Sequence, residues 1–94
     1  MKIIFTKNFL NKLDKQIKYI SKDKPKAAED FRENLIFEIE KIPLNPLSYT
    51  KSRFFVDENI RELIFKGYRI VFEIRKKEII SIFGFHKWER KLRN

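Results

Sequence analysis

The stretch Arg61-Glu62-Leu63-Ile64-Phe65-Lys66-Gly67-Tyr68-Arg69-Ile70-Val71-Phe72-Glu73-Ile74 decides the fold of this 94-residue chain. Two runs of β-branched, aromatic and aliphatic residues meet at Lys66-Gly67, where the glycine can take the positive φ that a tight hairpin needs. Because side chains alternate between the faces of a strand, the even-numbered residues from Ile70 to Ile74 share one face and the odd-numbered residues from Arg69 to Glu73 share the other. We therefore expect a hairpin with one buried face and one charged face that is available for function.

Further strands are expected on both sides of this hairpin. A turn at Lys76-Lys77 would add a third antiparallel strand, and the apolar residues on both faces of its run from Ile79 to Phe85 suit a central or well-covered strand. Residues 2–6 are expected to form a short N-terminal strand, and residues 53–56 a short or irregular one. The antiparallel meander itself is predicted to cover residues 59–66, 68–75 and 78–85.

Ahead of this meander, apolar residues recur at helical spacing in two stretches. Thr6 or Asn8 can cap the first helix, and the second is expected to begin at Pro25, with Asp23 as its cap, and to end at a loop over residues 43–53. The two apolar stripes consist of Phe9, Leu10, Leu13, Ile17 and Ile20 and of Ala28, Phe31, Leu35, Ile39 and Ile42. Two such stripes joined by a short turn predict an antiparallel helical hairpin. A helix lying on a membrane surface is the alternative for the first stretch.

These elements predict a single α+β domain over residues 1–94. An N-terminal strand leads into the antiparallel helical hairpin, which packs on one face of a three- or four-stranded antiparallel sheet. The basic tail from His86 to Asn94 is expected to be short helix or coil. The chain has no internal repeat, linker or low-complexity segment.

The composition is that of a folded, strongly basic protein. Hydrophobic residues make up 43% of the chain, and its ten phenylalanines allow a small domain to bury much apolar area. The 22 lysines and arginines outnumber the 13 aspartates and glutamates, which gives a formal net charge of +9. Such a field attracts polyanions or acidic proteins. A basic surface that only serves solubility is the alternative.

Several kinds of chemistry are excluded by residues that are rare or absent. Without cysteine there are no disulfides, thiolate nucleophiles or zinc ribbons. The single histidine, His86, and carboxylates without ligand spacing predict no metal site and no cofactor. Neither a phosphate-binding loop nor a serine nucleophile elbow is present in the sequence. No apolar run is long enough for a signal peptide or a membrane span, so we expect a soluble cytoplasmic protein without a membrane contact.

Basic side chains on and near the sheet are the candidates for a functional surface. Arginine grips phosphate with a planar fork of donors, and histidine can pass a proton when a 2′-hydroxyl attacks the neighbouring phosphate of RNA. Since Arg61 and Glu62 point to opposite faces of their strand, at most one of them joins Arg69 in a site. The residues expected to bind a nucleic acid or another target are Arg53, Arg61, Arg69, Lys87 and Arg90.

Alternatives stay open for three of the ring side chains. His86 can act in proton transfer or make a structural hydrogen bond at the end of its strand. Tyr68 and Trp88 can stack on a base. For Trp88 we favour a place in the core or against a partner.

In the order and spacing of its motifs, the chain resembles the RelE/ParE superfamily, the toxins of bacterial type II toxin–antitoxin modules. The resemblance covers nearly the whole chain. It rests on Pro25-Lys26-Ala27-Ala28, Ile42-Pro43-Leu44-Asn45-Pro46, Arg61-Glu62-Leu63, Gly67-Tyr68-Arg69-Ile70-Val71-Phe72 and Ile80-Ser81-Ile82-Phe83-Gly84-Phe85-His86, with Arg90 after them. The resemblance implies a growth-inhibiting toxin that a cognate antitoxin neutralises in a hetero-oligomeric complex. A flexible acidic segment of the antitoxin would wrap the helices and the sheet and complement the basic surface.

The superfamily divides by target. RelE-like members are endoribonucleases that cut messenger RNA in the ribosomal A site, with basic residues on the central strands and often a C-terminal tyrosine or histidine. ParE-like members lack that set and poison DNA gyrase. The resemblance therefore implies either DNA gyrase or the ribosome with its messenger RNA as the target.

Some residues match the RelE-like ribonucleases, and others depart from them. Arg69 matches the strand arginine of the superfamily, and His86 stands where some ribonuclease members have a catalytic histidine. As a metal-independent endoribonuclease (an mRNA interferase), the protein would use Arg69, His86 and Arg61 in catalysis. However, Ile60 and Glu62 stand where RelE-like enzymes have lysines, and no tyrosine follows His86. We favour a ParE-like gyrase inhibitor, with the ribonuclease and a non-toxic or inactive binding module as alternatives.

Overall fold

The central hairpin forms at the predicted place. In the computed structural model, which describes residues 1–87, β3 (Ile60–Phe65) and β4 (Tyr68–Arg75) pair antiparallel through the turn at Lys66-Gly67. The two turn residues have φ values of 46° and 84°. This is the left-handed backbone that two-residue hairpin turns use and that glycine adopts without steric cost. The hairpin prediction is confirmed.

The hairpin is part of a five-stranded sheet with the order β1-β5-β4-β3-β2. β1 (Lys2–Phe5) pairs in parallel with β5 (Ile79–Lys87), and all other neighbours, including β2 (Thr50–Lys51), are antiparallel. The α+β class is confirmed, with four antiparallel strands after the helices, and the difference from the prediction is the parallel pairing of the N-terminal strand. β1 can run parallel to β5 because nearly the whole domain connects them, and parallel neighbours need such a long connection.

β5 lies between β1 and β4, in the interior position that its apolar residues predicted. Val71 of β4 pairs with Gly84, and the next residue of β4 pairs with Ile82. Phe83 is therefore an extra residue that forms a β-bulge. A side-chain carbon at Gly84 would lie 2.9 Å from the Cβ of Val71. The close approach of the two strands at this point requires glycine.

β5 also extends beyond its predicted end. His86 pairs with Arg69 of β4, and Lys87 pairs with Tyr68. The prediction of helix or coil is therefore wrong at residues 86 and 87, because the ladder to β4 continues through them. The rest of the predicted tail, residues 88–94, lies outside the described residues.

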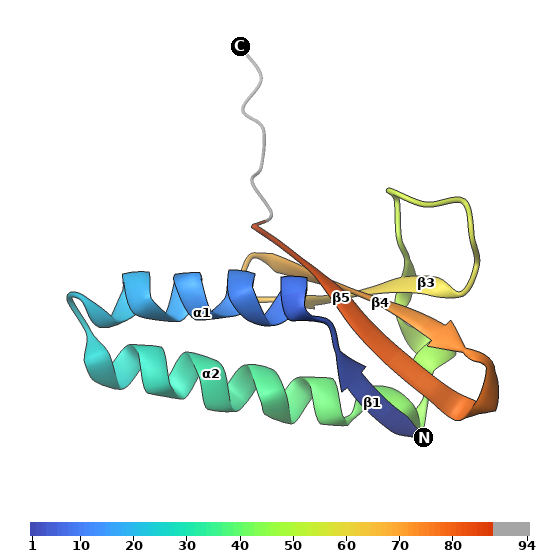
Figure 1. The fold of residues 1–94 in the computed structure, drawn as a ribbon, viewed down its shortest axis with the longest axis horizontal. Helices are drawn as coiled ribbons and strands as arrows, with labels where there is room; N and C mark the ends of the chain where they lie inside the picture. The colour runs from blue at the N-terminus through green and yellow to red at the C-terminus, as the bar shows by residue number, and fades with distance from the viewer. Residues whose placement is uncertain (88–94) are drawn as a thin grey trace, which may run out of the picture.

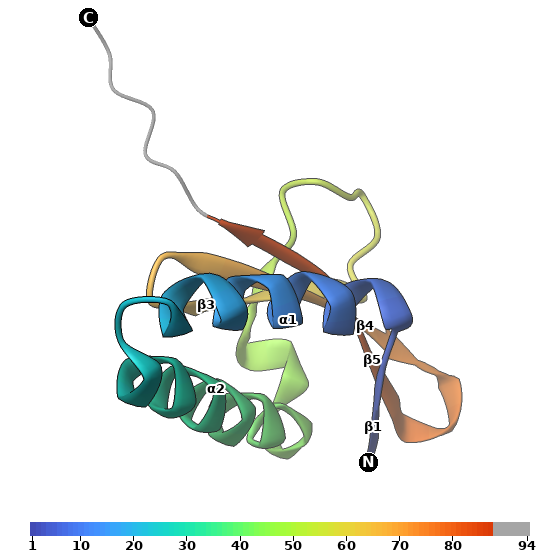
Figure 2. The same cartoon turned by 60° about the vertical axis from the view of Figure 1, so that its left-hand side comes forward.

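Two antiparallel helices, α1 (Lys7–Ser21) and α2 (Pro25–Glu40), lie side by side and cover one face of the sheet (Figures 1 and 2). The predicted helical hairpin is thus confirmed. Across residues 1–87, no helix has the length and apolar character needed to cross a bilayer.

The two helices begin differently. Thr6 caps α1, since its Oγ1 accepts a hydrogen bond from the backbone N–H of Phe9 at 3.2 Å. The predicted cap of α2 is wrong, because Lys24 and not Asp23 occupies the cap position and makes no side-chain bond there. Pro25 follows at the first helical position, where its fixed φ and missing N–H suit a helix start without a side-chain cap.

The core lies between the helical hairpin and the sheet. Phe31 of α2 stands edge-on to the rings of Phe65 and Tyr68, with ring centroids 5.4 Å apart in each pair. Edge-on aromatic pairs stabilise a core beyond the area that they bury. The buried cluster contains Phe9, Leu13, Phe31, Leu35, Ile39, Ile42, Leu63, Phe65, Tyr68, Ile70, Phe72, Ile80, Ile82 and Phe85. Both predicted helical stripes and the predicted apolar face of β4 contribute to it.

The segment between α2 and β3 differs from its prediction. It contains two one-turn 3-10 helices, η1 (Ile42–Leu44) and η2 (Pro46–Ser48). The strand predicted over residues 53–56 is wrong, because the chain leaves the sheet after β2 and forms a loop over residues 52–59. The backbone N–H of Ser52 donates to the carbonyl of Ile60 at 2.9 Å, which draws the two ends of the loop together. The loop projects from the sheet on the side away from α2 (Figures 1 and 2).

Candidate functional site

The charged face of the hairpin lies on the side of the sheet opposite to the helices. Arg69 of β4 is flanked across the ladder by Ile64 of β3 and by His86 of β5. Glu62 lies two residues from Ile64 on β3 and so faces the same way. Two of the residues selected from the sequence, Arg69 and His86, are therefore neighbours on one face.

Arg69 and Glu62 form a buried ion pair. The arginine Nη1 lies 2.5 Å from the carboxylate Oε1, and the two residues are only 7% and 2% exposed. The second carboxylate oxygen accepts a hydrogen bond from the hydroxyl of Ser52 at 2.9 Å. That hydroxyl in turn accepts the backbone N–H of Phe54 at 3.2 Å. The pair therefore links β3 and β4 to the first residues of the loop.

Arg61 lies on the other face of β3, so Glu62 is the neighbour that joins Arg69. The Nε of Arg61 donates to the carbonyl of Glu58 at 2.8 Å, and its Nη1 donates to the carbonyls of Leu47 and Tyr49 at 3.2 and 3.0 Å. These bonds hold the end of η2 and the end of the 52–59 loop against the edge of the sheet. The Arg61 side chain thus stabilises the backbone of these two segments and is not part of a site with Arg69 or His86.

His86 is exposed at the end of β5, beside the loop. Its ring lies 5.6 Å from the ring of Phe54. Partial burial lowers the pKa of His86, the positive charge of Lys12 lowers it further, and the Glu62 carboxylate acts in the opposite direction. The ring is therefore held in its neutral form more firmly than a solvated histidine.

Stability is expected to fall below about pH 6.5 because of His86. Since its pKa is lower in the folded protein than the roughly 6.5 of an unfolded chain, protonation below that value favours unfolding until the pH has passed the folded pKa. We expect the urea midpoint to drop more between about pH 7 and pH 5 in the wild type than in His86→Gln, whose carboxylates are the same. An equal drop in both proteins would contradict the shift.

The loop carries three consecutive apolar side chains at its tip. Phe54, Phe55 and Val56 are 56%, 44% and 101% exposed. The ring of Phe55 stands edge-on to that of Phe83 on β5, with centroids 5.7 Å apart. Arg53, which was selected from the sequence, is exposed in the same loop. We call residues 53–56 the apolar loop.

Of the remaining candidates, the structure describes Lys87 and Tyr68, which pair across β5 and β4. Lys87 is exposed at the end of β5. Tyr68 is stacked on Phe85 inside the core, with centroids 4.9 Å apart, which disfavours the alternative that it stacks on a base. Arg90 and Trp88 lie outside the described residues. Within residues 1–87, no group of three histidine, aspartate or glutamate side chains is placed to hold a metal ion.

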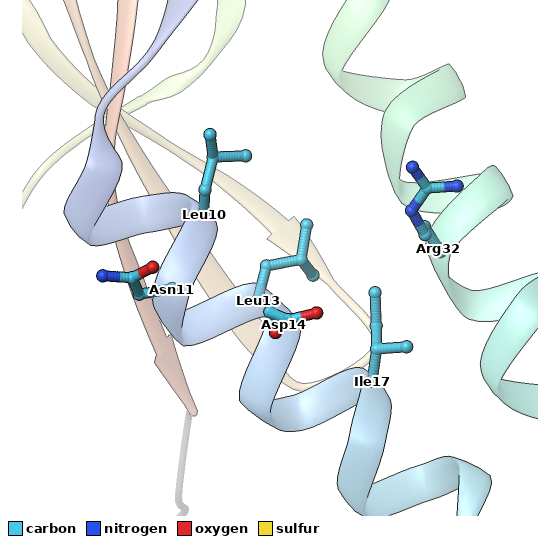
Figure 3. A pocket seen from close by; sticks show the side chains of 6 residues that line it. All are labelled: Leu10, Asn11, Leu13, Asp14, Ile17 and Arg32. Carbon is cyan, nitrogen blue, oxygen red and sulfur yellow. The ribbon is translucent and has the colours of Figure 1, made fainter.

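A shallow groove lies on the other side of the molecule, between the two helices (Figure 3). Its volume is about 320 Å³, and Leu10, Leu13 and Ile17 of α1 line it opposite Arg32 of α2. A second hollow of about 320 Å³ shares Arg32 and continues along α2 past Phe37. Leu10 is 47% exposed and Phe37 59% exposed. We call this surface the helix groove.

Sequence reasoning missed two features of these surfaces. The apolar loop was predicted to be a strand, although its three adjacent apolar residues do not alternate with polar ones as in a half-buried strand. The Glu62–Arg69 pair was also not predicted, but their places at i and i+7 around a two-residue turn put them on one face of the hairpin. That spacing is a signal that could have found the pair.

The comparisons with known proteins agree with this architecture. The family model described as "ParE toxin of type II toxin-antitoxin system, parDE" matches residues 3–90. A solved structure titled "Chromosomal ParDE TA system from P. aeruginosa" contains a similar chain, with a TM-score of 0.77 and 15% sequence identity over 95% of this chain and 97% of that chain. No curated protein gives a match to the sequence.

The fold and the family match together define a toxin of the RelE/ParE superfamily. Within it, the chain belongs to the ParE toxin family of type II toxin–antitoxin systems, because the family model matches nearly its whole length.

Proposed function

We propose that the protein inhibits bacterial growth in the cytoplasm by binding DNA gyrase, and that a cognate antitoxin neutralises it in a hetero-oligomeric complex. The buried Glu62–Arg69 ion pair is the observation that carries this proposal. A phosphate clamp needs an accessible guanidinium, whereas the Arg69 side chain is almost fully buried against a carboxylate. The negative charge of Glu62 at that place opposes the approach of an RNA phosphate.

The other residues of the ribonuclease alternative support the same conclusion. Transesterification needs an acid or base, a phosphate clamp and a charge-stabilising group that converge on one phosphate. Arg61 is bonded to three backbone carbonyls on the opposite face of β3. His86 has only Arg69 beside it from the predicted catalytic set. Among the described residues, the geometry therefore favours a toxin that acts by binding.

The helix groove supports the antitoxin part of the proposal. Its exposed apolar residues follow the axes of α1 and α2, which suits a flexible segment that folds as it binds. The formal net charge of +9 favours an acidic segment and speeds its encounter with the toxin. The antitoxin would then cover the helical side of the toxin.

The experiment that tests this function is induced expression in bacteria without an antitoxin, with plasmid supercoiling and messenger RNA integrity followed in the same cells. We expect growth arrest, altered supercoiling and intact messenger RNA, both for the wild type and for His86→Gln. His86→Gln is the informative variant because the residue is exposed and its change leaves the buried ion pair in place. Messenger RNA cleavage that is lost in His86→Gln would indicate the ribonuclease, and growth without arrest would indicate an inactive binding module.

A further inference from the structure

The apolar loop exposes hydrophobic side chains that the fold does not need to expose. Val56 has its whole side chain in solvent, and Phe54 and Phe55 have about half of theirs. Ile64 on β3, which pairs with Arg69 and lies on the sheet face opposite to the helices, is 43% exposed as well. Contiguous apolar surface of this kind marks interaction sites in soluble proteins.

The loop over residues 52–59, which contains the apolar loop, is held in one conformation by hydrogen bonds within the toxin itself. Its ends are joined by the hydrogen bond from Ser52 to Ile60, and Ile60 also donates its N–H to the carbonyl of Asp57 at 3.1 Å. The buried Glu62 carboxylate holds the Ser52 hydroxyl at one end, and Arg61 holds the carbonyl of residue 58 at the other. A pre-ordered loop loses little conformational entropy on binding, which favours affinity.

The base of the loop is packed while its tip is open. Phe55 rests edge-on against Phe83, and Phe54 lies beside His86, so both rings are supported from the sheet. Val56 extends beyond them into solvent. The result is a small convex apolar surface, which fits a pocket that already exists on a folded partner. The helix groove has the opposite shape and suits a flexible segment.

The charges around the loop narrow the choice of partner. The carboxylates of the loop are engaged locally, since Glu58 pairs with Lys51 at 4.0 Å and Asp57 accepts the N–H of Asn59 at 2.8 Å. The basic side chain of Arg53, in the same loop, is exposed. A second copy of this chain, with its own charge of +9, would be repelled. An acidic partner would be attracted.

The apolar character of the tip disfavours a nucleic acid. Single-stranded nucleic acids bind proteins by stacking bases on aromatic faces. The two rings of the loop, Phe54 and Phe55, lie against His86 and Phe83, and its most exposed residue, Val56, has no aromatic face. Exposed apolar side chains that lie together instead mark surfaces that bind other proteins.

We propose that the apolar loop is the anchor with which the toxin binds its target, a folded protein that offers a preformed apolar pocket with carboxylates at its rim. Val56 enters the pocket, while Arg53 faces the acidic rim. The inference rests on the proposed function in one respect, namely that the toxin acts through a protein partner. The buried network of Ser52, Glu62 and Arg69 acts as the positioning device for this anchor.

The test compares Val56→Ser with Leu44→Ser. Leu44, on η1, is an aliphatic residue that is 85% exposed and lies outside the loop, so it is the matched control. Each variant is measured for binding to purified DNA gyrase and to a short single-stranded RNA, for growth arrest on induction, and for its urea midpoint. We expect Val56→Ser to bind gyrase at least about tenfold more weakly and to arrest growth less, as for an interface hot spot. Leu44→Ser should match the wild type, with all three urea midpoints alike.

The outcomes test two proposals separately, namely that the apolar loop is the anchor and that gyrase is the target. If the wild type does not bind gyrase but Val56→Ser alone relieves growth arrest, the gyrase target is wrong and the anchor is supported. If the wild type binds gyrase and Val56→Ser binds equally well, the anchor is overturned while the gyrase target stands. Loss of RNA binding by Val56→Ser, with unchanged gyrase binding, would also overturn a protein-binding anchor.

Discussion

Glu62→Ala is expected to lower the free energy of unfolding by about 3 kcal/mol or more, as found when one partner of a buried ion pair is removed. The change leaves the buried Arg69 guanidinium without its carboxylate and removes the acceptor of the Ser52 hydroxyl. Urea unfolding at neutral pH measures the loss. Because the carboxylate also holds the first turn of the loop, we expect a weakened toxin among the molecules that remain folded.

The control for this prediction is the double variant Glu62→Leu with Arg69→Met. Buried ion pairs replaced by apolar residues of similar volume are often neutral or stabilising. The double variant is therefore expected to regain most of the stability that Glu62→Ala loses. A cost below about 1 kcal/mol for Glu62→Ala would place the pair in the class of solvent-exposed ion pairs, which contradicts its burial.

Phe31→Ala is expected to cost about 3–5 kcal/mol of unfolding free energy, the usual cost of removing a buried aromatic ring. Phe31 is 7% exposed and joins α2 to the sheet through edge-on contacts with Phe65 and Tyr68. Its loss would leave a cavity where the helical hairpin meets the turn end of β3 and β4. Urea unfolding again measures the change.

The same helix provides the matched control. Phe37 is 59% exposed and lies against Lys41, whose Nζ is 4.6 Å from the ring centroid. Phe37→Ala is expected to cost less than about 1 kcal/mol, since it removes mainly exposed area. Similar costs for Phe31→Ala and Phe37→Ala would mean that α2 does not pack on the sheet through its predicted stripe.

The elements that could be predicted from the sequence are those with strong local patterns. The apolar stripes of α1 and α2 repeat at helical spacing, and β4 carries Ile70, Phe72 and Ile74 on one face and both of its charged residues before Arg75 on the other. The turn at Lys66-Gly67 has a local requirement for positive φ. Each of these signals lies within a few residues of the chain, so no tertiary contact was needed to interpret it.

The features that could not be predicted depend on contacts between distant segments. The parallel pairing of β1 with β5 joins residues 2–5 to residues 79–82, and nothing in the short run at the N-terminus specifies that neighbour. The loop over residues 52–59 leaves the sheet because Ser52 is hydrogen-bonded to Ile60 and to Glu62. Glu62 is ten residues away in the sequence. Local propensity favours a strand there, and the tertiary contacts override it.

The candidate site also has features that local sequence could predict and features that depend on contacts between strands. Its arginine and histidine could be selected from residue type and strand position, but the ionic state of the site could not. Glu62 looked like a departure from the lysines of a ribonuclease, and the structure gives it a role as the buried partner of Arg69. Glu62 on β3 thus both pairs with Arg69 and holds Ser52 at the start of the 52–59 loop.

The molecule offers a concave surface on its helices and a convex one beyond its sheet. On our proposals, an antitoxin segment occupies the helix groove and the target receives the apolar loop. Because the two surfaces belong to different faces of the sheet, substitutions can separate neutralisation from toxicity. Phe37→Ala should weaken binding of the antitoxin, and Val56→Ser should weaken binding of the target.

The most direct test of a toxin that acts by binding is gyrase supercoiling in a purified system. Relaxed plasmid, ATP and gyrase are incubated with excess wild-type toxin or His86→Gln, and the same proteins are incubated with ribosomes programmed with messenger RNA. We predict that both proteins inhibit supercoiling and that the messenger RNA stays intact. Normal supercoiling together with messenger RNA cleavage by the wild type, but not by His86→Gln, would contradict this account.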